Sequence, residues 1–353
     1  MTMTREFGLD ATQHRVEEAI TSFIESKERG PQGDHLAWAI QVLKQFLGGG
    51  KRVRPLYCHA GWLAAAGNEE PPEQLMEVSV GLEFFHALAL LHDDVIDRAE
   101  FRRLRPAAHR LLAGTGPVGD EWFGISAAIL LGDLCEAWSA ELLMGVAEEG
   151  VPRGARDFVN RMRAEMLTGQ LMDISRSTGT FGTVDHALQV IYYKTSLYTV
   201  KRPLQIGAAM AGGGPEVLRA CADYARYLGE AFQLLDDLED IEPPPGAVSN
   251  AGNDLREGKK TAILALAGQN ATEGQLARLR GLLGRRDLDE VELAEARRII
   301  VDTGATRAAR RTITVRRRQA LEVLDRAPFH PEGRVALREM ADRALPGIAQ
   351  WSE

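Results

Sequence analysis

The chain has 353 residues, 45% of them apolar, and a formal net charge of −8. This apolar content is sufficient for a globular core, and the acidic balance argues against a nucleic-acid-binding surface. No stretch approaches the roughly 18 consecutive apolar residues of a membrane span, and the opening residues MTMTREFGLD lack the apolar core of a signal peptide. We therefore expect a cytoplasmic protein without stable membrane insertion.

Apolar residues recur at helical spacing along nearly the whole chain, whereas strand-like alternation between turn signals is hard to find. This pattern predicts an all-α protein. Clear examples are HRVEEAITSFIESK, EQLMEVSVGLEFFHALALLHDDVID and ARYLGEAFQLLDDLEDI. We treat residues 1–353 as a single domain, with the motif-bearing core at about 45–265 and C-terminal helices at 266–353. The arginine-rich RRTITVRRRQ in the C-terminal part is best explained as a solvated helix face.

The first candidate anion site is the stretch GGGKRVRP at residues 48–55. Its glycines allow a close approach to the backbone, and Lys51 and Arg54 lie one helical turn apart. It is not a Walker loop, because Arg52 follows Lys51 where Ser or Thr would be needed. Taken alone, these cations would be ordinary surface residues.

The next segment, residues 73–97, is predicted to form one helix that begins after Pro71-Pro72. At 100° per residue, Asp93, Asp97 and His86 share one face of this helix. Two carboxylates one turn apart repel each other unless a cation lies between them. Magnesium fits, because it uses one or two carboxylates together with water and substrate phosphate. A solvated acidic helix end would explain the motif about equally well if it stood alone.

Three further cationic groups follow along the chain. The pair Arg102 and Arg103 could hold phosphate oxygens bidentately. The stretch YYKTS supplies Lys194 and Thr195, and DLREGKKT supplies Lys259. Each of these has an ordinary explanation as a surface residue, but their occurrence together with acidic motifs favours a diphosphate site.

A second acidic motif occurs in FQLLDDLED, near the end of another apolar helix. Asp236, Asp237 and Asp240 repeat the earlier spacing, and Gln233 lies one turn before Asp236. Two such helices facing each other across a central cavity would form a multi-metal site that holds one diphosphate from both sides. The Pro- and Gly-rich segment at 242–254 is predicted to be a loop that closes over this site.

In these motifs the sequence resembles the trans (E)-isoprenyl diphosphate synthases, also called polyprenyl synthetases, from about residue 45 to 265. The stretches that carry the resemblance are GGKRVRP, HDDVID followed by RRLRPAAH, GQLMD, YYKTS, FQLLDD and NDLREGKKT. Two positions depart from the family pattern. Leu104 stands where Gly usually follows the Arg pair, and Ser249 stands where a Lys is common.

The resemblance implies an isoprenoid synthase fold and a transferase that joins isopentenyl diphosphate to an allylic diphosphate. It also implies Mg²⁺, with three ions per site, and a homodimer. The implied metal ligands are Asp93, Asp97, Asp236, Asp237 and Asp240. The implied allylic diphosphate ligands are Arg102, Lys194, Thr195, Gln233 and Lys259, and the implied isopentenyl diphosphate ligands are Lys51, Arg54, His86 and Arg103. Asp93, Asp97, Asp236, Lys194 and Lys259 are the implied catalytic residues.

Product length in such enzymes depends on the bulk of the first aspartate helix below Asp93. Phe85, Leu88 and Ala89 lie about 6 to 12 Å down its axis. Leu88 and Ala89 leave room for a C15 product, and Phe85 could stop a longer one. We therefore expect a C20 product, geranylgeranyl diphosphate, with C15 as the next choice and a longer polyprenyl product as a further alternative.

Two other classes of protein remain open from the sequence. A terpene cyclase would ionise a prenyl diphosphate without a second substrate, but the isopentenyl diphosphate set and the second DDxxD motif argue against it. A non-catalytic subunit of a hetero-oligomer would typically lose one aspartate motif, and this chain keeps both.

Overall fold

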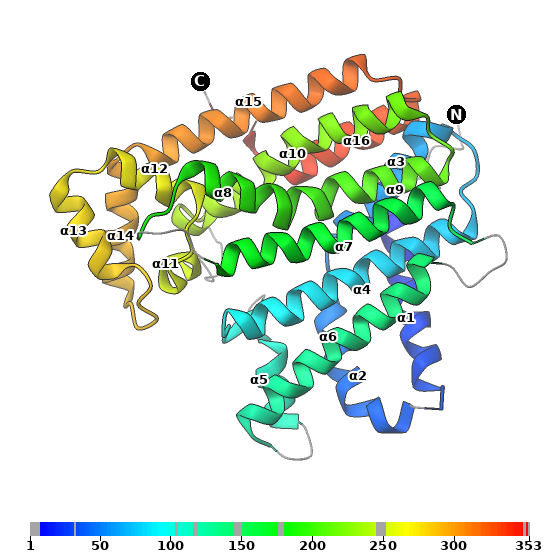
Figure 1. The fold of residues 1–353 in the computed structure, drawn as a ribbon, viewed down its shortest axis with the longest axis horizontal. Helices are drawn as coiled ribbons and strands as arrows, with labels where there is room; N and C mark the ends of the chain where they lie inside the picture. The colour runs from blue at the N-terminus through cyan, green and yellow to red at the C-terminus, as the bar shows by residue number, and fades with distance from the viewer. Residues whose placement is uncertain are drawn as a thin grey trace. The chain divides into compact units, whose positions relative to one another are not determined.

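A computed structural model of the chain describes residues 8–31, 33–102, 105–115, 119–144, 150–175, 180–244, 252–348 and 351. These residues form helices almost throughout (Figure 1). Among them, the only sheet is the two-stranded pair of β1 (Phe101–Arg102) and β2 (Arg105–Pro106). The predicted all-α class is confirmed.

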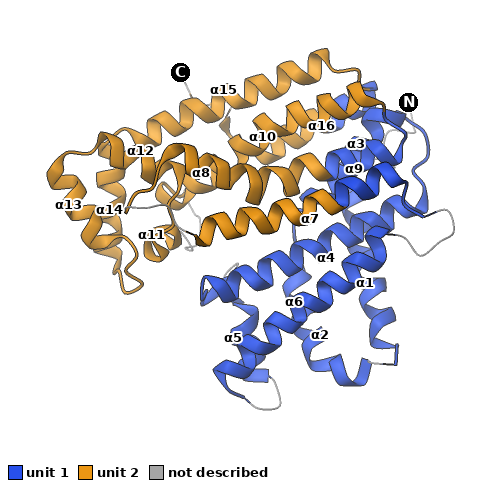
Figure 2. Ribbon diagram, viewed as in Figure 1, with its two compact units in different colours: residues 1–159, 203–213, 330–336 blue, residues 160–202, 214–329, 337–353 orange. Residues whose placement is uncertain are grey.

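The chain forms two compact units, drawn in different colours in Figure 2. Unit 1 consists of Met1–Val159, Pro203–Gly213 and His330–Ala336. Unit 2 consists of Asn160–Arg202, Gly214–Phe329 and Leu337–Glu353. Each unit therefore combines segments that are distant in sequence. The assignment of residues 1–353 to a single domain stays a prediction.

In unit 1, α4 packs along α6 and against α3. Phe84 of α4 lies 5.1 Å from Phe23 and 5.5 Å from Trp138, measured between ring centroids. Aromatic pairs at such distances bury a large apolar area and fix how the helices face each other. The elements in chain order are α1 (Leu9–Glu28), α2 (Gly33–Leu47), α3 (Val53–Ala66), α4 (Glu73–Ile96), α5 (Ala108–Thr115), α6 (Glu121–Met144) and most of α9 (Arg202–Met210).

In unit 2, the long helix α10 packs against α15 and against a π-helix, η1. Tyr224 of α10 donates a hydrogen bond to the Leu337 carbonyl at 2.7 Å. The elements in chain order are most of α7 (Arg153–Ile174), α8 (Val184–Val190), η1 (Ile191–Lys201), α10 (Pro215–Ile241), α11 (Asn253–Glu257), α12 (Ala262–Asn270), α13 (Glu273–Leu282), α14 (Glu290–Asp302), α15 (Ala305–Arg326) and much of α16 (Pro331–Ala344).

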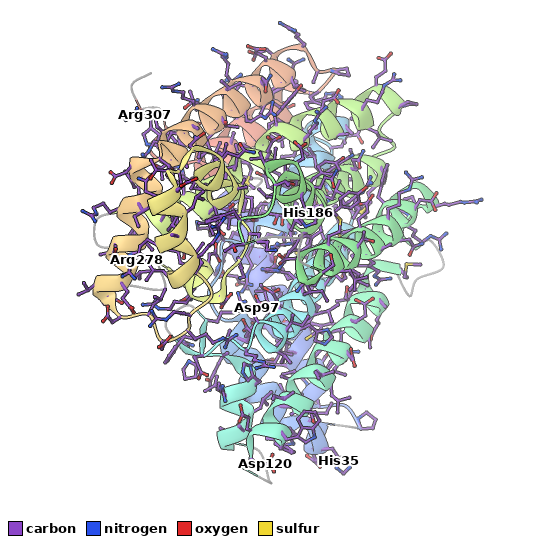
Figure 3. All side chains as sticks on the ribbon, turned by 60° about the vertical axis from the view of Figure 1, so that its left-hand side comes forward. His35, Asp97, Asp120, His186, Arg278 and Arg307 are labelled. Carbon is purple, nitrogen blue, oxygen red and sulfur yellow. The ribbon has the colours of Figure 1, made fainter. Side chains whose placement is uncertain are left out.

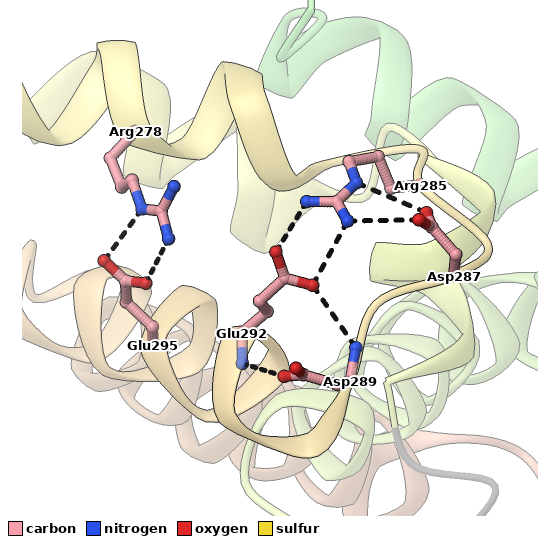
Figure 4. Close-up of polar contacts among 6 residues, drawn as sticks. All are labelled: Arg278, Arg285, Asp287, Asp289, Glu292 and Glu295. Atoms are coloured by element: carbon pink, nitrogen blue, oxygen red, sulfur yellow. Dashed lines mark hydrogen bonds and ion pairs between the residues drawn. The ribbon is translucent and has the colours of Figure 1, made fainter.

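Ion pairs at the surface of unit 2 join α14 to α13 and to the segment between these two helices (Figure 4). Arg278 pairs with Glu295 at 2.6 Å, and Arg285 contacts Glu292 at 2.6 Å and Asp287 at 3.2 Å. Exposed pairs of this kind add little to stability, because water and salt screen them. None of these paired residues belongs to the candidate site.

The arginines of RRTITVRRRQ lie on α15. Arg310 pairs with Glu242, Arg316 pairs with Glu230 at 3.0 Å, and Arg317 pairs with an aspartate of α16. The charges of these three arginines are therefore largely satisfied by carboxylates of the same unit. This arrangement favours a paired helix face over an anion site.

Two helices, α4 and α6, are long and apolar enough to cross a membrane when judged by length and composition alone. The core helices of soluble proteins meet the same criteria, and 67% of the apolar window of α4 is buried within the fold. We therefore regard α4 as a core helix. The corresponding window of α6 is 39% buried, so part of its apolar surface faces outward.

Candidate active site

The first acidic motif lies at the C-terminal end of α4, where Figure 3 labels Asp97. The helix begins after Pro72 and ends at Ile96, with Asp97 as its C-cap, so the predicted helix over 73–97 is confirmed. The Asp97 backbone N–H donates to the Asp93 carbonyl at 2.8 Å. The two carboxylates therefore lie one turn apart, and both side chains are half-exposed.

Arg98 ends α4 directly after this motif. It adopts the left-handed conformation with φ of 51°, which is uncommon for residues other than glycine. Its N–H donates to the Val95 carbonyl, and the N–H of Ala99 donates to the Asp94 carbonyl. This pair of hydrogen bonds is a Schellman motif, which satisfies the last carbonyls of a helix. Arg98 therefore has a structural role in turning the chain after Asp97.

Asp94, the middle acid of the motif, points into the protein and is only 1% exposed. Arg102 returns to it from β1: its Nε lies 2.8 Å from both carboxylate oxygens, and its Nη2 lies 2.5 Å from Oδ1. A bidentate arginine–carboxylate pair fixes the orientation of both side chains. Asp94 therefore positions Arg102, a role that the sequence did not reveal. The predicted ligand Arg103, together with Leu104 and Ser249, lies outside the described residues.

The predicted isopentenyl diphosphate residues that the structure describes all belong to unit 1. Lys51 is exposed just before α3, and Arg54 is buried in the first turn of α3. His86 is half-buried on α4, two turns before Asp93. Since α3 packs against α4, Arg54 and His86 come from two neighbouring helices, and Lys51 comes from the loop just before α3.

The three residues predicted to limit product length also lie on α4. Phe85 and Leu88 are buried, and Ala89 is half-buried. They precede the acidic motif by one to two turns, as the sequence predicts.

In unit 2, Lys194 and Thr195 lie on the π-helix η1. π-helical turns are rare and often occur at functional sites. Two glycines allow neighbouring helices to touch this turn. A Cβ at Gly169 of α7 would lie 2.4 Å from the Lys194 nitrogen, and one at Gly229 of α10 would lie 2.6 Å from the Ser196 Cβ. The π-helix is therefore held between α7 and α10 by contacts that only glycine permits.

A chain of polar contacts connects η1 to its neighbours. Lys194 Nζ lies 2.6 Å from a carboxylate oxygen of Asp173 on α7. Thr195 donates to the Gln233 side-chain oxygen at 2.8 Å, and the Gln233 amide donates to Asp237 at 2.9 Å. The predicted allylic diphosphate residues Lys194, Thr195 and Gln233 thus lie together, next to the second acidic motif. Asp173 had no assigned role, although it ends the GQLMD stretch.

The second acidic motif lies in the last turns of α10. Asp236 is exposed, and Asp237 is buried. Burial, followed by the nearby charge of Asp254, raises the pKa of Asp237 well above its usual range. The same two causes, in the same order, raise the pKa of Asp240 to about 7. The motif thus crowds carboxylates whose negative charge is poorly compensated by the protein.

Lys259 is the last predicted cation of unit 2. It follows α11, and its N–H donates to the Asp254 carbonyl at 2.9 Å. Its ammonium lies 3.0 Å from Glu257 and 3.6 Å from Asp254. Lys259 is therefore close to two carboxylates of α11, and the charge of one of them, Asp254, also raises the pKa of Asp237 in the second acidic motif.

The donor set of these motifs fits a magnesium ion. One carboxylate oxygen of Asp240 accepts from the Gly252 N–H at 2.7 Å, while the other is buried and makes no hydrogen bond with the described residues. Within the described parts of the chain, no three His, Cys, Asp or Glu side chains form a ready-made metal cage. Magnesium does not require one, since water and substrate phosphate complete its coordination. The motifs therefore fit an ion that binds together with a diphosphate.

Asp240→Asn is expected to change how stability depends on pH in the metal-free protein. The folded state holds the proton of Asp240 up to its pKa of about 7, whereas the unfolded chain releases it near 3.8. Because the folded state binds more protons in this window, the contribution of Asp240 to stability falls as the pH rises. Asparagine does not titrate. The Tm of the variant should therefore rise relative to that of the wild type between about pH 4 and pH 8.

Calorimetry of both proteins in EDTA across this pH range measures the effect. His59, whose pKa burial lowers to about 4, titrates in both proteins and cancels in the comparison. A difference in Tm that stays constant with pH would show that Asp240 does not carry the predicted proton.

Comparison with known proteins shows similarity to one family over most of the chain. The family model for polyprenyl synthetase matches residues 36–300. A short chain isoprenyl diphosphate synthase of Methanothermobacter thermautotrophicus is 31% identical over 301 residues, which cover 84% of this chain and 86% of that protein.

Two solved structures share the fold. One is a geranylgeranyl pyrophosphate synthase from Corynebacterium glutamicum complexed with isoprenyl diphosphate and magnesium. It has a TM-score of 0.87 and 34% identity, with 97% of this chain and 98% of that chain covered. The other is a polyprenyl synthase from Caulobacter crescentus CB15 complexed with calcium and isoprenyl diphosphate, with a TM-score of 0.79, 28% identity and coverage of 95% and 96%.

Proposed function

The chain belongs to the polyprenyl synthetase family, and on that premise we propose that it makes geranylgeranyl diphosphate, a C20 product. It is a prenyl diphosphate synthase and therefore a prenyltransferase, as its sequence predicts. The structural neighbour from Corynebacterium glutamicum is a geranylgeranyl pyrophosphate synthase, and this likeness supports the C20 product.

The proposed reaction joins isopentenyl diphosphate to an allylic diphosphate. Lys51, Arg54 and His86 of unit 1 bind isopentenyl diphosphate, and Arg103 is proposed to assist them. Loss of the diphosphate from the allylic substrate leaves a carbocation, which the double bond of isopentenyl diphosphate attacks. A proton is then lost, and the product is five carbons longer. The observation that carries this proposal is that one chain contains both acidic motifs together with one group of cationic residues for each of the two diphosphates.

Several cationic and polar residues are assigned to the allylic diphosphate in this proposal. In unit 2, Lys194 and Lys259 offset the charge of the leaving diphosphate, while Thr195 and Gln233 orient its oxygens. In unit 1, Asp94 holds the guanidinium of Arg102 in place, and Arg102 is proposed to bind the diphosphate. Fixed cations of this kind favour the departure of an anion, because their position costs no reorganisation during the reaction.

Divalent metal use is consistent with the structural neighbours, which are complexed with magnesium or calcium. We propose Mg²⁺ for this chain, with three ions in the complete site. Asp93 and Asp97 hold ions from α4, and Asp236, supported by Asp237 and Asp240, holds an ion from α10. When bound, magnesium neutralises the leaving diphosphate as a Lewis acid.

The assembled enzyme is proposed to be a soluble cytoplasmic homodimer. Apolar side chains on α6 face solvent: Trp122, Ile129 and Leu130 are 74%, 41% and 67% exposed. An exposed apolar patch on a soluble chain often marks a protein interface. A second copy of the chain is the proposed partner for this surface.

Phe85→Ala is expected to lengthen the product. In the wild-type enzyme, Leu88 and Ala89 leave room for a growing tail, and the buried Phe85 ring stops it nearly a turn deeper. Removal of the ring opens space for at least one more isoprene unit. Chromatography of the dephosphorylated products should show mainly C20 for the wild type and a larger share of C25 and longer products for the variant.

Phe84→Ala is the matched control for this experiment. Its ring is equally buried but contacts Phe23 and Trp138 within the core. This control should lower the Tm without changing product length. A main wild-type product of C30 or longer would contradict the C20 proposal, as would equal lengthening by both variants.

A further inference from the structure

We infer that Arg52 and Glu83 form a positioning pair for the isopentenyl diphosphate site. This inference rests on the proposed function of Lys51, Arg54 and His86. Neither member of the pair contacts substrate in the proposal. The pair instead sets the distance between the loop before α3 and the turn of α4 that carries His86.

The pair is almost fully buried. The side chains of Arg52 and Glu83 are 6% and 5% exposed, and Arg52 Nη1 donates to Glu83 Oε2 at 2.9 Å. Arg52 Nη2 also donates to the Leu47 carbonyl at the end of α2, at 2.6 Å. Its Nε lies 3.8 Å from Glu17 of α1. One guanidinium thus joins α1, α2 and α4 at the point where the loop enters α3.

The backbone at Arg52 is itself unusual. Arg52 is the N-cap of α3 and adopts the left-handed conformation with φ of 46°. A non-glycine residue holds such a conformation only when its surroundings enforce it, and strained residues cluster at functional sites. Gln13 of α1 adds a further restraint by donating to the Gly50 carbonyl at 3.0 Å. The loop that carries Lys51 is therefore fixed from several sides.

The position of the pair connects it to the substrate residues. Arg52 follows Lys51 directly, and Arg54 lies two residues further along. Glu83 lies three residues before His86 on α4, so the two side chains share one side of the helix. A single ion pair therefore couples the Lys51 loop to the helical turn of His86.

If the pair had a purely structural role, its variants would behave differently. Removal of one partner of a buried ion pair leaves an unpaired charge and destabilises the fold, wherever the pair lies. Such damage would affect both substrates alike. A positioning role affects the substrate whose ligands the pair aligns, because small displacements of binding groups weaken specific contacts. The effects on the two Michaelis constants distinguish these roles.

The experiment uses the full-length enzyme with magnesium, isopentenyl diphosphate and farnesyl diphosphate. Glu83→Gln keeps the shape of the side chain but removes its charge, and Arg52→Lys keeps the charge but removes the planar fork. Both variants are expected to raise the KM for isopentenyl diphosphate by about tenfold while the KM for farnesyl diphosphate changes by less than about twofold. Val80→Ala, a buried change one turn earlier on α4, is the control that lowers Tm without shifting either KM.

Each alternative outcome has a distinct meaning. An unchanged KM for isopentenyl diphosphate would overturn the inference, as would equal rises for both substrates. Failure of both variants to fold would assign the pair to folding alone and would also overturn it. A wild-type enzyme that incorporates no isopentenyl diphosphate would instead contradict the proposed function.

Discussion

Asp93→Asn and Asp236→Asn are each expected to lower kcat by about a thousandfold while leaving the fold intact. Asparagine keeps the shape of aspartate but loses the negative charge that holds a metal ion. A thousandfold loss corresponds to about 4 kcal/mol of transition-state stabilisation, a reasonable share for a metal that neutralises a leaving diphosphate. Both side chains reach solvent, so their replacement should cost little stability.

Steady-state kinetics at several magnesium concentrations, together with circular dichroism, measure this effect. Asp223→Asn is the matched control, because Asp223 is an exposed aspartate on α10, well before the acidic motif. The control should retain wild-type activity. Near-wild-type turnover of Asp93→Asn or Asp236→Asn would remove that residue from the metal site.

Gly169→Ala is expected to reduce both stability and turnover strongly. The added Cβ would lie 2.4 Å from the Lys194 nitrogen and 2.7 Å from the Tyr193 carbonyl carbon. Both are backbone atoms, which cannot rotate away as a side chain can. Separating α7 from η1 should cost about 2 to 4 kcal/mol of unfolding free energy. It should also move Lys194 away from Asp173 and lower kcat.

Gly154→Ala is the matched control on the same helix. A Cβ at Gly154, in the first turn of α7, meets no atom within 4 Å, so alanine should not destabilise the helix. Urea denaturation and steady-state kinetics separate the two variants. Equal stability and turnover for Gly169→Ala and the wild type would show that α7 and η1 can separate without harm to the site.

Much of the site could be predicted because its chemistry repeats along the chain. Helical periodicity predicts α4 and places Asp93 and Asp97 on one face, which the backbone hydrogen bond between them confirms. Periodicity does not reveal what each remaining acid contacts. Asp94 lies about 100° around the helix from Asp93, so it points into the protein and binds Arg102 instead of facing solvent.

The shape of η1 could not be predicted in this way. Nothing in YYKTS specifies a π-helix, because the cause lies in residues far away in sequence. Gly169 and Gly229 bring α7 and α10 close to the turn, and each glycine taken alone has many explanations. Local patterns identified Lys194 and Thr195, but only long-range packing reveals that Asp173 and Gln233 hold them.

The burial of Arg52 in the glycine-rich loop could not be predicted from the sequence either. The sequence identified Lys51 and Arg54 as candidate anion ligands and assigned no role in the site to Arg52 between them. The structure shows Arg52 buried and paired with Glu83 of α4, while Lys51 is exposed. Residues of one charge in a short run can thus have opposite roles, because the backbone directs neighbouring side chains to different surroundings.

Incorporation of radiolabelled isopentenyl diphosphate by the purified full-length enzyme is the measurement that bears most directly on the proposed function. Each allylic starter is supplied in turn, with magnesium or with EDTA, and the dephosphorylated products are sized. We predict magnesium-dependent incorporation that ends mainly at C20. Absence of incorporation, with a cyclic hydrocarbon formed from the allylic substrate instead, would contradict a chain-elongating transferase.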